Sequence, residues 1–272
     1  MGKLVWLASY PKSGNTWVRA FLHNYIANAP TPHSINELVD FSVSECAAAF
    51  FGKAGEIITP AQAQALRPDV HKHLTTLHDD LVFVKTHNAN LVVHDVALCT
   101  PALSAGAIYV VRDPRDVAVS YAAFTGKSLD EIIDFMSQEG AANASDGVQV
   151  FELLSSWSRH VVSWVAAPNR LLVRYEDLLA QPERHFARMI KFLGTANSMP
   201  DPERLRRAIE FSSFNTLASQ EAQTGYRAGG PSGESFFRKG EAGGWRTHLT
   251  ATQADKIRSD HGEIMQKLGY ID

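Results

Sequence analysis

Four short apolar runs stand out in the pattern of hydrophobic and polar positions. They cover Leu4 to Ala8, Leu81 to Val84, Ala107 to Val111 and Leu171 to Tyr175. Short continuous apolar runs of this kind are typical of parallel strands that are buried on both faces. The pattern therefore predicts a central parallel sheet built from these four segments.

Helical periodicity separates the runs. Apolar residues on one helical face follow the first run and stop before Pro30: Trp17, Val18, Phe21, Leu22, Tyr25 and Ile26. Asp113 and Pro114 suit the N-cap and first position of a helix that would extend to about Phe124. Three more helices are indicated by Val150, Phe151, Leu154, Trp157, Val161 and Trp164, by Phe186, Ile190 and Leu193, and by Ile257, Ile264 and Leu268. Alternating strands and helices predict an α/β fold, with a central parallel β-sheet flanked by α-helices. At this length we expect a single domain, 1–272.

Composition narrows the class of partner. The chain is 45% hydrophobic and carries 26 Lys and Arg against 29 Asp and Glu, a formal charge of −3. No global positive field therefore indicates a nucleic-acid partner, and any anion site must be local. No run approaches the roughly 20 apolar residues of a membrane-spanning helix, and the first run is too short for a signal-peptide core, so we expect a cytoplasmic protein without membrane insertion. Cys46 and Cys99 lack metal-site spacing and are expected to be buried free thiols.

A candidate anion-binding loop joins the first apolar run to the first helix. Unpaired N–H groups at a helix N-terminus bind phosphate, and Gly14 permits a close approach. Lys12 adds a positive charge and Thr16 a hydroxyl, which suit a group that becomes more negative as a bond breaks. The Walker pattern is absent, because the lysine precedes the glycine and no glycine stands five residues before Gly14. Alone, such a sequence is more often an ordinary turn.

A second candidate anion site follows the third run. Arg112 ends that run, and Ser120 lies about two turns along the next helix, so both side chains can face one ligand beyond the carboxyl end of the sheet. The alternative is an ion pair between Arg112 and Asp113 or Asp116.

A third cluster of cations lies in a segment rich in Gly, Ser and charge, residues 224–244. We expect this segment to be a mobile loop that closes over a phosphate. Its candidate ligands are Arg238, Lys239 and Gly240, for which solvated surface is the alternative.

Three segments, YPKSGNTW, VVRDPRDVAVSY and FFRKGEAGGW, resemble the signature segments of the cytosolic-type sulfotransferase family, which uses 3′-phosphoadenosine 5′-phosphosulfate (PAPS). KTH at 85–87, RYEDL at 174–178 and SSF at 212–214 are also similar to this family, so the resemblance covers nearly the whole chain. It implies a P-loop NTPase-like sulfotransferase fold that transfers sulfonate from PAPS to a hydroxyl or amine of a small-molecule acceptor. The product would be 3′-phosphoadenosine 5′-phosphate (PAP), and no metal is needed.

The resemblance also implies roles for individual residues. The 5′-phosphosulfate would be held by Lys12, Ser13, Gly14, Asn15 and Thr16. The 3′-phosphate would be bound by Arg112 and Ser120, joined by Arg238, Lys239 and Gly240. The adenine site would be formed by Trp17, Tyr175, Ser212, Phe214 and Phe237. The catalytic group would comprise His87, Lys12, Lys85 and Ser120.

His87 resembles the catalytic base of the family. A neutral imidazole, with an ordinary pKa near 6.5, can accept a proton around neutral pH. The alternative is a structural histidine, since the chain contains 11 histidines. Lys12 is expected to stabilise the charge that grows on the leaving phosphate, and Lys85 to help hold the sulfonate during in-line transfer.

The sequence departs from the family pattern at several positions. Asn15 replaces a more usual Thr, and GGWR at 243–246 replaces a more usual Gly-Asp-Trp-Lys. The dimerisation pattern KxxxTVxxxE is only approximated by Arg246, Thr250, Ala251 and Asp255, so a homodimer through this pattern has weak support. Two alternatives stay open: a kinase-like phosphotransferase on the same fold, which would need Mg²⁺, and a nucleotide-binding module without turnover.

The remaining motifs concern histidines, arginines and the acceptor pocket. His71, His73 and His78 are interpreted as a solvated helix face rather than a zinc site. Three arginines, Arg204, Arg206 and Arg207, receive no role. Acceptor identity depends on a pocket built from residues 29–80 and 124–147, for which Phe41, Phe50 and Phe51 are candidates, with core packing as the alternative.

Overall fold

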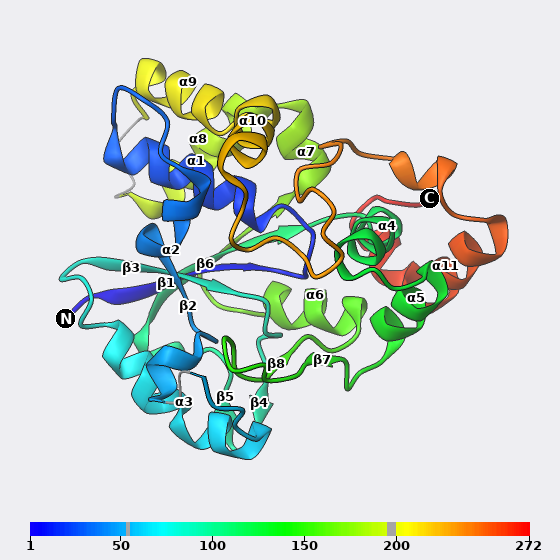
Figure 1. The fold of residues 1–272 in the computed structure, drawn as a ribbon, viewed down its shortest axis with the longest axis horizontal. Helices are drawn as coiled ribbons and strands as arrows, with labels where there is room; N and C mark the ends of the chain where they lie inside the picture. Colours follow the sequence, from blue (N-terminus) through cyan, green and yellow to red (C-terminus); the bar gives the residue numbers. More distant parts are fainter. Residues whose placement is uncertain (53–54, 195–199) are drawn as a thin grey trace.

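A five-stranded sheet forms the centre of the computed structural model, which describes residues 1–52, 55–194 and 200–272 (Figure 1). The strand order is β2-β3-β1-β6-β9, and every neighbouring pair is parallel. The strands are β1 (Lys3–Ser9), β2 (Ser42–Ser44), β3 (Leu81–Thr86), β6 (Ser104–Val111) and β9 (Arg170–Arg174). The four predicted strands are confirmed. The edge strand β2 is additional, and its sequence, SVS, is too short and polar to form an apolar run.

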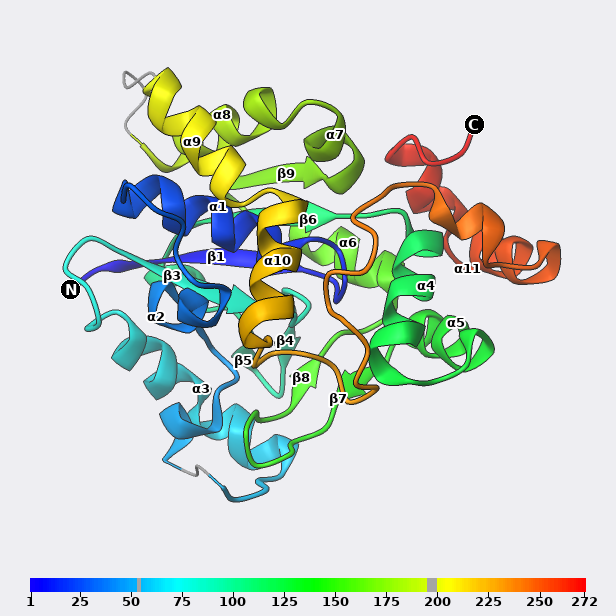
Figure 2. The ribbon, with the colours of Figure 1, turned by 45° about the horizontal axis from the view of Figure 1, so that its top comes forward.

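Both faces of the sheet are buried, which explains why the strands lack polar alternation. In β1, Leu4 and Trp6 belong to one hydrophobic core, while Val5 and Leu7 belong to a second core on the opposite face. Helices cover each face, as Figures 1 and 2 show. The α/β architecture predicted from the sequence is thus confirmed.

Residues of the helices divide between the two cores. The core around Val5 and Leu7 receives residues from α1 (Asn15–Ala27), α7 (Tyr175–Ala180), α8 (Pro182–Leu193) and α9 (Pro202–Phe211). The core around Leu4 and Trp6 receives residues from α3 (Pro60–Leu74), α4 (Pro114–Thr125), α5 (Leu129–Ser137), α6 (Trp157–Val165) and α11 (Ala251–Lys267). A smaller cluster joins α1 to α2 (Leu38–Phe41) and α10 (Phe214–Thr224). Two short antiparallel pairs complete the strands, β4 (Val92–Val93) with β5 (Val96–Ala97) and β7 (Ala142–Asn143) with β8 (Glu152–Leu153).

One helix is shorter than its periodicity predicts. Residues 150–156 are not helical. They include the short strand β8, and Ser155 has a φ of 62°, which lies outside the right-handed helical region. The hydroxyl of Ser156 then caps α6 by accepting the N–H of Arg159. The prediction of a helix from Val150 was therefore wrong, while α6 itself is confirmed from Trp157 onward. Tyr175, predicted as the end of a strand, instead begins α7.

A loop of residues 225–243 links α10 to a short 3₁₀ helix and contains no helix or strand. It runs between α10 and α4, beyond the carboxyl ends of the central strands (Figures 1 and 2). Both cysteines are buried and free, as predicted. In the described part of the chain, no helix has both the length and the apolar character that a bilayer span requires.

Candidate active site

A cavity of about 1060 Å³ opens beyond the carboxyl ends of β1, β3 and β6. The strand β1 has β3 on one side and β6 on the other, so the strand order reverses direction at β1. Parallel sheets usually bind ligands at such a reversal, beyond the carboxyl ends of the strands. Most predicted site residues line this one cavity: Lys12, Gly14, Asn15, Thr16, Trp17, Lys85, His87, Arg112, Ser120, Tyr175, Phe214, Phe237, Arg238, Lys239 and Gly240. Two of the predicted residues, Ser13 and Ser212, do not line it.

The loop before α1 has the form of an anion site. Gly14 occupies the N-cap with a φ of 104°, and no side chain caps the helix. The hydroxyl of Ser13 is buried and has no hydrogen-bond partner among the described residues. A Cβ atom on Gly14 would stand 2.8 Å from the ring of Tyr175, so only glycine fits. The uncapped N–H groups at the start of α1 fit an anionic ligand, whereas the Ser13 side chain is buried outside the cavity lining.

Asn15 ties this loop to the sheet. Its Nδ2 donates a hydrogen bond to the carbonyl oxygen of Leu7 over 2.8 Å, and the side chain is buried. The departure from the family pattern at this position thus replaces a hydroxyl with an amide that anchors the loop to β1.

Lys12 is held between two aromatic rings. Its Nζ lies 3.6 Å from the ring centroid of Phe236 and 4.3 Å from that of Phe124. Burial, then the charges of Arg238 and Arg112, lower the pKa of Lys12 to about 7. An anion bound here would remove this repulsion and restore the charge on the lysine.

Arg112 connects the anion loop to the 225–243 loop. It donates hydrogen bonds to the carbonyl oxygens of Lys12 (3.0 Å) and Glu241 (2.9 Å). Its guanidinium carbon lies 4.4 Å from the ring centroid of Tyr175. Arg112 is thus positioned at the edge of the cavity by backbone and aromatic contacts.

The acidic partners proposed as an alternative for Arg112 are engaged elsewhere. Asp113 forms an ion pair with Arg115 at 2.7 Å. Asp116 accepts the N–H groups of Gly243 (2.6 Å) and Trp245 (2.9 Å). Arg112 forms an ion pair with neither aspartate, so the ion-pair alternative was wrong.

Two carboxylates anchor the 225–243 loop. Asp116 holds its end near Gly243, as described above. Glu221, in α10, accepts the N–H groups of Phe236 (2.6 Å) and Phe237 (2.9 Å). These anchors bring the segment from Arg238 to Gly240 against the cavity. Within that segment, a Cβ on Gly240 would overlap the ring of Phe214, and the φ of 62° at Gly240 also favours glycine.

Of the residues predicted to form the adenine site, the aromatic ones line the cavity and Ser212 does not. Trp17 contacts Tyr175 edge-on, with ring centroids 5.7 Å apart, and Phe214 lines the same cavity. The hydroxyl of Ser212 points away, because it donates to the carbonyl oxygen of Ala208 over 2.8 Å and the residue is fully buried. Its neighbour Ser213 lines the cavity instead.

His87 is held in a single orientation. Its Nδ1 lies 2.7 Å from the carbonyl oxygen of Ser9, and because a carbonyl only accepts, Nδ1 carries the proton and Nε2 is left as the free base. Its backbone N–H donates to Glu152 (2.9 Å), and its carbonyl accepts from His160 Nε2 (3.1 Å). Burial, followed by the charge of Lys85, holds the pKa of His87 well below its usual range. The ring is therefore neutral at physiological pH.

Arg19 and Glu152 are buried charged residues of the cavity that were not predicted from the sequence. Arg19 is 7% exposed and donates to Ser42 Oγ (2.6 Å) and to the carbonyl oxygen of Leu38 (2.9 Å). Glu152 is 2% exposed. Each is flanked in the sequence by apolar residues, and a charge inside an apolar stretch is the signal that could have revealed them.

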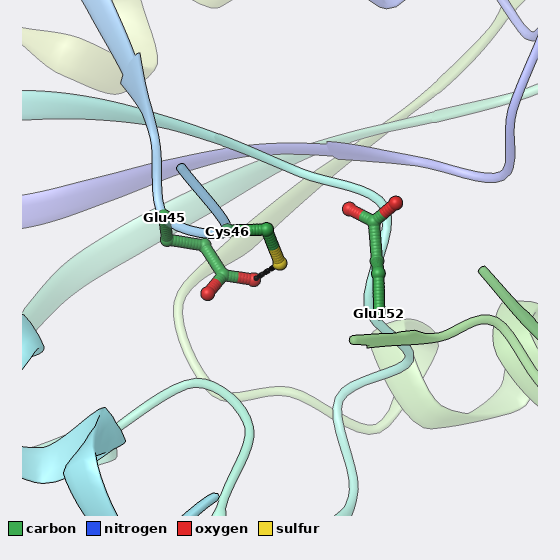
Figure 3. Close-up of side chains that lie close together, drawn as sticks. All are labelled: Glu45, Cys46 and Glu152. Carbon is green, nitrogen blue, oxygen red and sulfur yellow. Dashed lines mark hydrogen bonds between the residues drawn. The ribbon is translucent and has the colours of Figure 1, made fainter. Parts of the chain in front are cut away.

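The group of Glu45, Cys46 and Glu152 is the one potential metal cluster found among the described residues (Figure 3). The oxygens of Glu45 are already bound by Thr86 Oγ1 at 2.9 Å and by the guanidinium of Arg67. Burial alone would raise the pKa of Glu45, but the charge of Arg67 holds it well below its usual range. We interpret this group as a buried ion pair of the core rather than a metal site.

His71 belongs to the same buried region. It is 0% exposed, and its Nδ1 lies 2.8 Å from Thr100 Oγ1. The expected solvated face was therefore wrong for His71, although His73 and His78 are exposed. Helical spacing explains the difference, because His71 shares the inner face of α3 with Arg67 and Leu74.

Sequence relatives and solved structures that resemble this chain include several sulfotransferases. "Sulfotransferase 1A1" from Canis lupus familiaris is 26% identical, over 97% of this chain and 83% of the relative. "Flavonol 3-sulfotransferase" from Flaveria bidentis is also 26% identical, over 98% of this chain and 83% of the relative. Among solved structures, retinol dehydratase in a complex with retinol and PAP has a TM-score of 0.63 at 20% identity, covering 96% of this chain and 81% of that one. Mouse sulfotransferase SULT7A1 complexed with PAP has a TM-score of 0.60 at 19% identity, covering 97% and 84%.

The family model described as "Sulfotransferase domain" matches residues 3–269, which include every segment that forms the cavity. The chain therefore belongs to the sulfotransferase domain family.

Proposed function

We propose that this PAPS-dependent sulfotransferase binds its donor across the cavity and uses His87 to activate the acceptor. The 5′-phosphosulfate contacts the loop of residues 12–16. The 3′-phosphate contacts Arg112, Ser120 and the segment from Arg238 to Gly240. The observation that carries this proposal is the meeting of two separate cationic sites and a neutral imidazole in one cavity. The kinase-like alternative has no support from the family match.

The geometry suits a single in-line transfer. The acceptor hydroxyl or amine gives its proton to Nε2 of His87 while its oxygen or nitrogen bonds to sulfur. The bond from sulfur to the bridging phosphate oxygen breaks on the opposite side, and negative charge develops on PAP. Lys12 stabilises that charge as an ammonium ion, while Lys85 holds the sulfonate. Because Nδ1 of His87 is fixed by Ser9, the imidazolium formed in this step is stabilised by a hydrogen bond.

The aromatic rings that line the cavity supply the adenine site in this proposal. Trp17 and Phe214 enclose the base, and Tyr175 and Phe237 border it. Ser212 contributes through the backbone of its turn, since its hydroxyl is bound to Ala208.

The wider setting follows the relatives. We propose that residues 1–272 act as one sulfotransferase domain, in the cytoplasm, on a small-molecule acceptor. Relatives from Arabidopsis thaliana and Danio rerio are named cytosolic sulfotransferases, and the flavonol enzyme is named for a small-molecule acceptor. A homodimer remains a prediction with weak support from the degenerate pattern at residues 246–255.

Replacement of His87 tests the proposal. His87→Ala should lower the turnover of a phenol acceptor with PAPS by about 10²- to 10⁴-fold, because the general base is lost, while PAP affinity is retained. Mass spectrometry of the sulfonated phenol measures turnover, and calorimetry measures the dissociation constant of PAP. The exposed His73 gives a matched control, since His73→Ala should change neither quantity. Full turnover in His87→Ala would remove the imidazole from the mechanism.

A further inference from the structure

A buried carboxylate lies beside His87 in the cavity and has no role in the donor binding proposed above. Glu152 lines the cavity and is 2% exposed. One of its oxygens accepts the backbone N–H of His87 (2.9 Å), and the other accepts Nδ2 of Asn143 (3.0 Å). Both donors are neutral, and a carboxylate can accept about two further hydrogen bonds. The group thus keeps acceptor capacity at the place where a substrate must approach the base.

Glu152 has no positive partner within the part of the chain that the structure describes. None of the ion pairs formed by those residues includes it. A carboxylate oxygen of Glu45 lies within 4.8 Å of one of Glu152, and Glu45 is neutralised by Arg67. Figure 3 shows the Glu152 side chain standing to one side of Glu45 and Cys46. A buried charge without a counter-ion is costly, and a second carboxylate close by increases that cost.

The surroundings of Glu152 form a built pocket. Asn143, its cross-strand partner in the β7–β8 pair, accepts a hydrogen bond from the hydroxyl of Tyr121 over 3.2 Å. The ring of Tyr121 lies 6.0 Å from that of Phe135 and 6.5 Å from that of Phe124, and all of these residues line the cavity. Aromatic faces favour both flat apolar groups and cations.

We propose that Glu152 binds a protonated amine of the acceptor, so that the substrate class is hydroxyl compounds that also carry a primary amine. The amine supplies the missing positive charge, whereas a second hydroxyl would supply only a hydrogen bond. The cations Lys85 and Arg19 also line the cavity, but the bound donor brings phosphate and sulfonate charges that offset them. This inference rests on the proposed sulfotransferase function and adds the class of its acceptor.

Tyramine and 4-ethylphenol provide a matched pair of probes, because they differ only by the amino group. With PAPS at pH 7, the wild-type kcat/KM for tyramine should exceed that for 4-ethylphenol by about 30-fold. Glu152→Gln keeps the shape and removes the charge, so the ratio of the two values should fall to near one. Asp146→Asn is the control, because Asp146 is an exposed carboxylate of the same cavity whose Oδ1 accepts the backbone N–H groups of Val148 and Gln149. Its ratio should stay at the wild-type value.

These measurements distinguish a failure of the Glu152 inference from a failure of the proposed sulfotransferase function. A wild-type ratio near one, or a ratio that survives Glu152→Gln, overturns the role of Glu152 even when both phenols are sulfonated. If the preference for tyramine is instead lost in Asp146→Asn, the amine binds at Asp146, and the role of Glu152 is overturned as well. If neither phenol is turned over, binding to the protein–PAP complex is measured by saturation-transfer NMR, and equal or absent binding of the two probes overturns the inference. Failure to bind PAP, in contrast, overturns the proposed function itself. Since the wild-type ratio is informative alone, the test does not depend on the folding of a variant.

Discussion

Lys12 offers a quantitative test of how the donor site works. Burial and the charges of Arg238 and Arg112 lower the pKa of this lysine to about 7. At pH 8 the free protein therefore carries only about 0.1 proton on Lys12. A bound bisphosphate favours the ammonium form and moves the pKa back toward the ordinary 10.5. Binding of PAP at pH 8 should then take up about 0.9 proton.

Calorimetry in two buffers measures this uptake directly. The proton comes from the buffer, so the observed binding enthalpy at pH 8 should change with the ionisation enthalpy of the buffer, for example between Tris and phosphate. The affinity for PAP should also fall by about tenfold between pH 8 and pH 9, since about one proton is taken up with the ligand. The phosphate groups of PAP contribute little here, because their second pKa lies near 6.

A conservative variant isolates the lysine. In Lys12→Arg the guanidinium stays charged throughout this pH range, so the buffer dependence should vanish and the affinity should become flat with pH. A wild-type enthalpy that is independent of the buffer would refute the reasoning. So would an unchanged proton uptake in Lys12→Arg, because the proton would then belong to another group.

Two further outcomes follow from the site and the core. Arg112→Ala should raise the PAP dissociation constant by about 10- to 100-fold through the loss of charge-assisted contacts, as measured by calorimetry, and an unchanged constant would contradict its role. The protein should also lose stability in acid, because burial lowers the pKa of His160 to about 3 and that of His261 to about 4. These pKa values lie below the ordinary 6.5, so the unfolded chain binds protons first, and stability present above pH 6.5 is lost as the pH falls. Near pH 5 these two histidines together should contribute roughly 2.5 kcal/mol per pH unit to the fall in unfolding free energy measured in urea titrations, so His261→Asn should reduce the total slope by about 1.2 kcal/mol per pH unit. A flat profile from pH 6.5 to 5 would contradict this.

The parts of the fold predicted from the sequence are those with a strong local pattern. The central strands are continuous apolar runs because helices cover both faces of the sheet, and the helix at Pro114 begins with a proper cap at Asp113. The edge strand β2 has only three residues, and β8 has two, so neither leaves a periodic signal. The strand β2 pairs with β3, which lies far along the chain, and β8 pairs with the equally short β7, so both depend on pairing that a local pattern does not encode.

The same limit applies to the candidate site. Motif residues such as Lys12 and Arg112 could be predicted because they belong to short, recognisable sequence motifs. Glu152 was missed because its importance lies in its burial beside His87, 65 positions earlier in the chain. Ser212 and Ser213 are indistinguishable as letters, and only the helix geometry decides that the first hydroxyl binds Ala208 while the second residue borders the cavity.

Loop closure and donor binding should depend on each other, because closure gathers cations around the anion site. The 225–243 loop brings Arg238 toward Lys12 and Arg112. After burial, the charges of Arg238 and Arg112 are the next causes of the lowered pKa of Lys12, whereas the charge of Glu221 raises it. The closed arrangement therefore contains a repulsion between cations. A bisphosphate removes that repulsion, so it stabilises the closed loop more than the open one. Since such coupling is reciprocal, any change that loosens the loop, including loss of the Glu221 anchor at Phe236 and Phe237, has to weaken the donor as well.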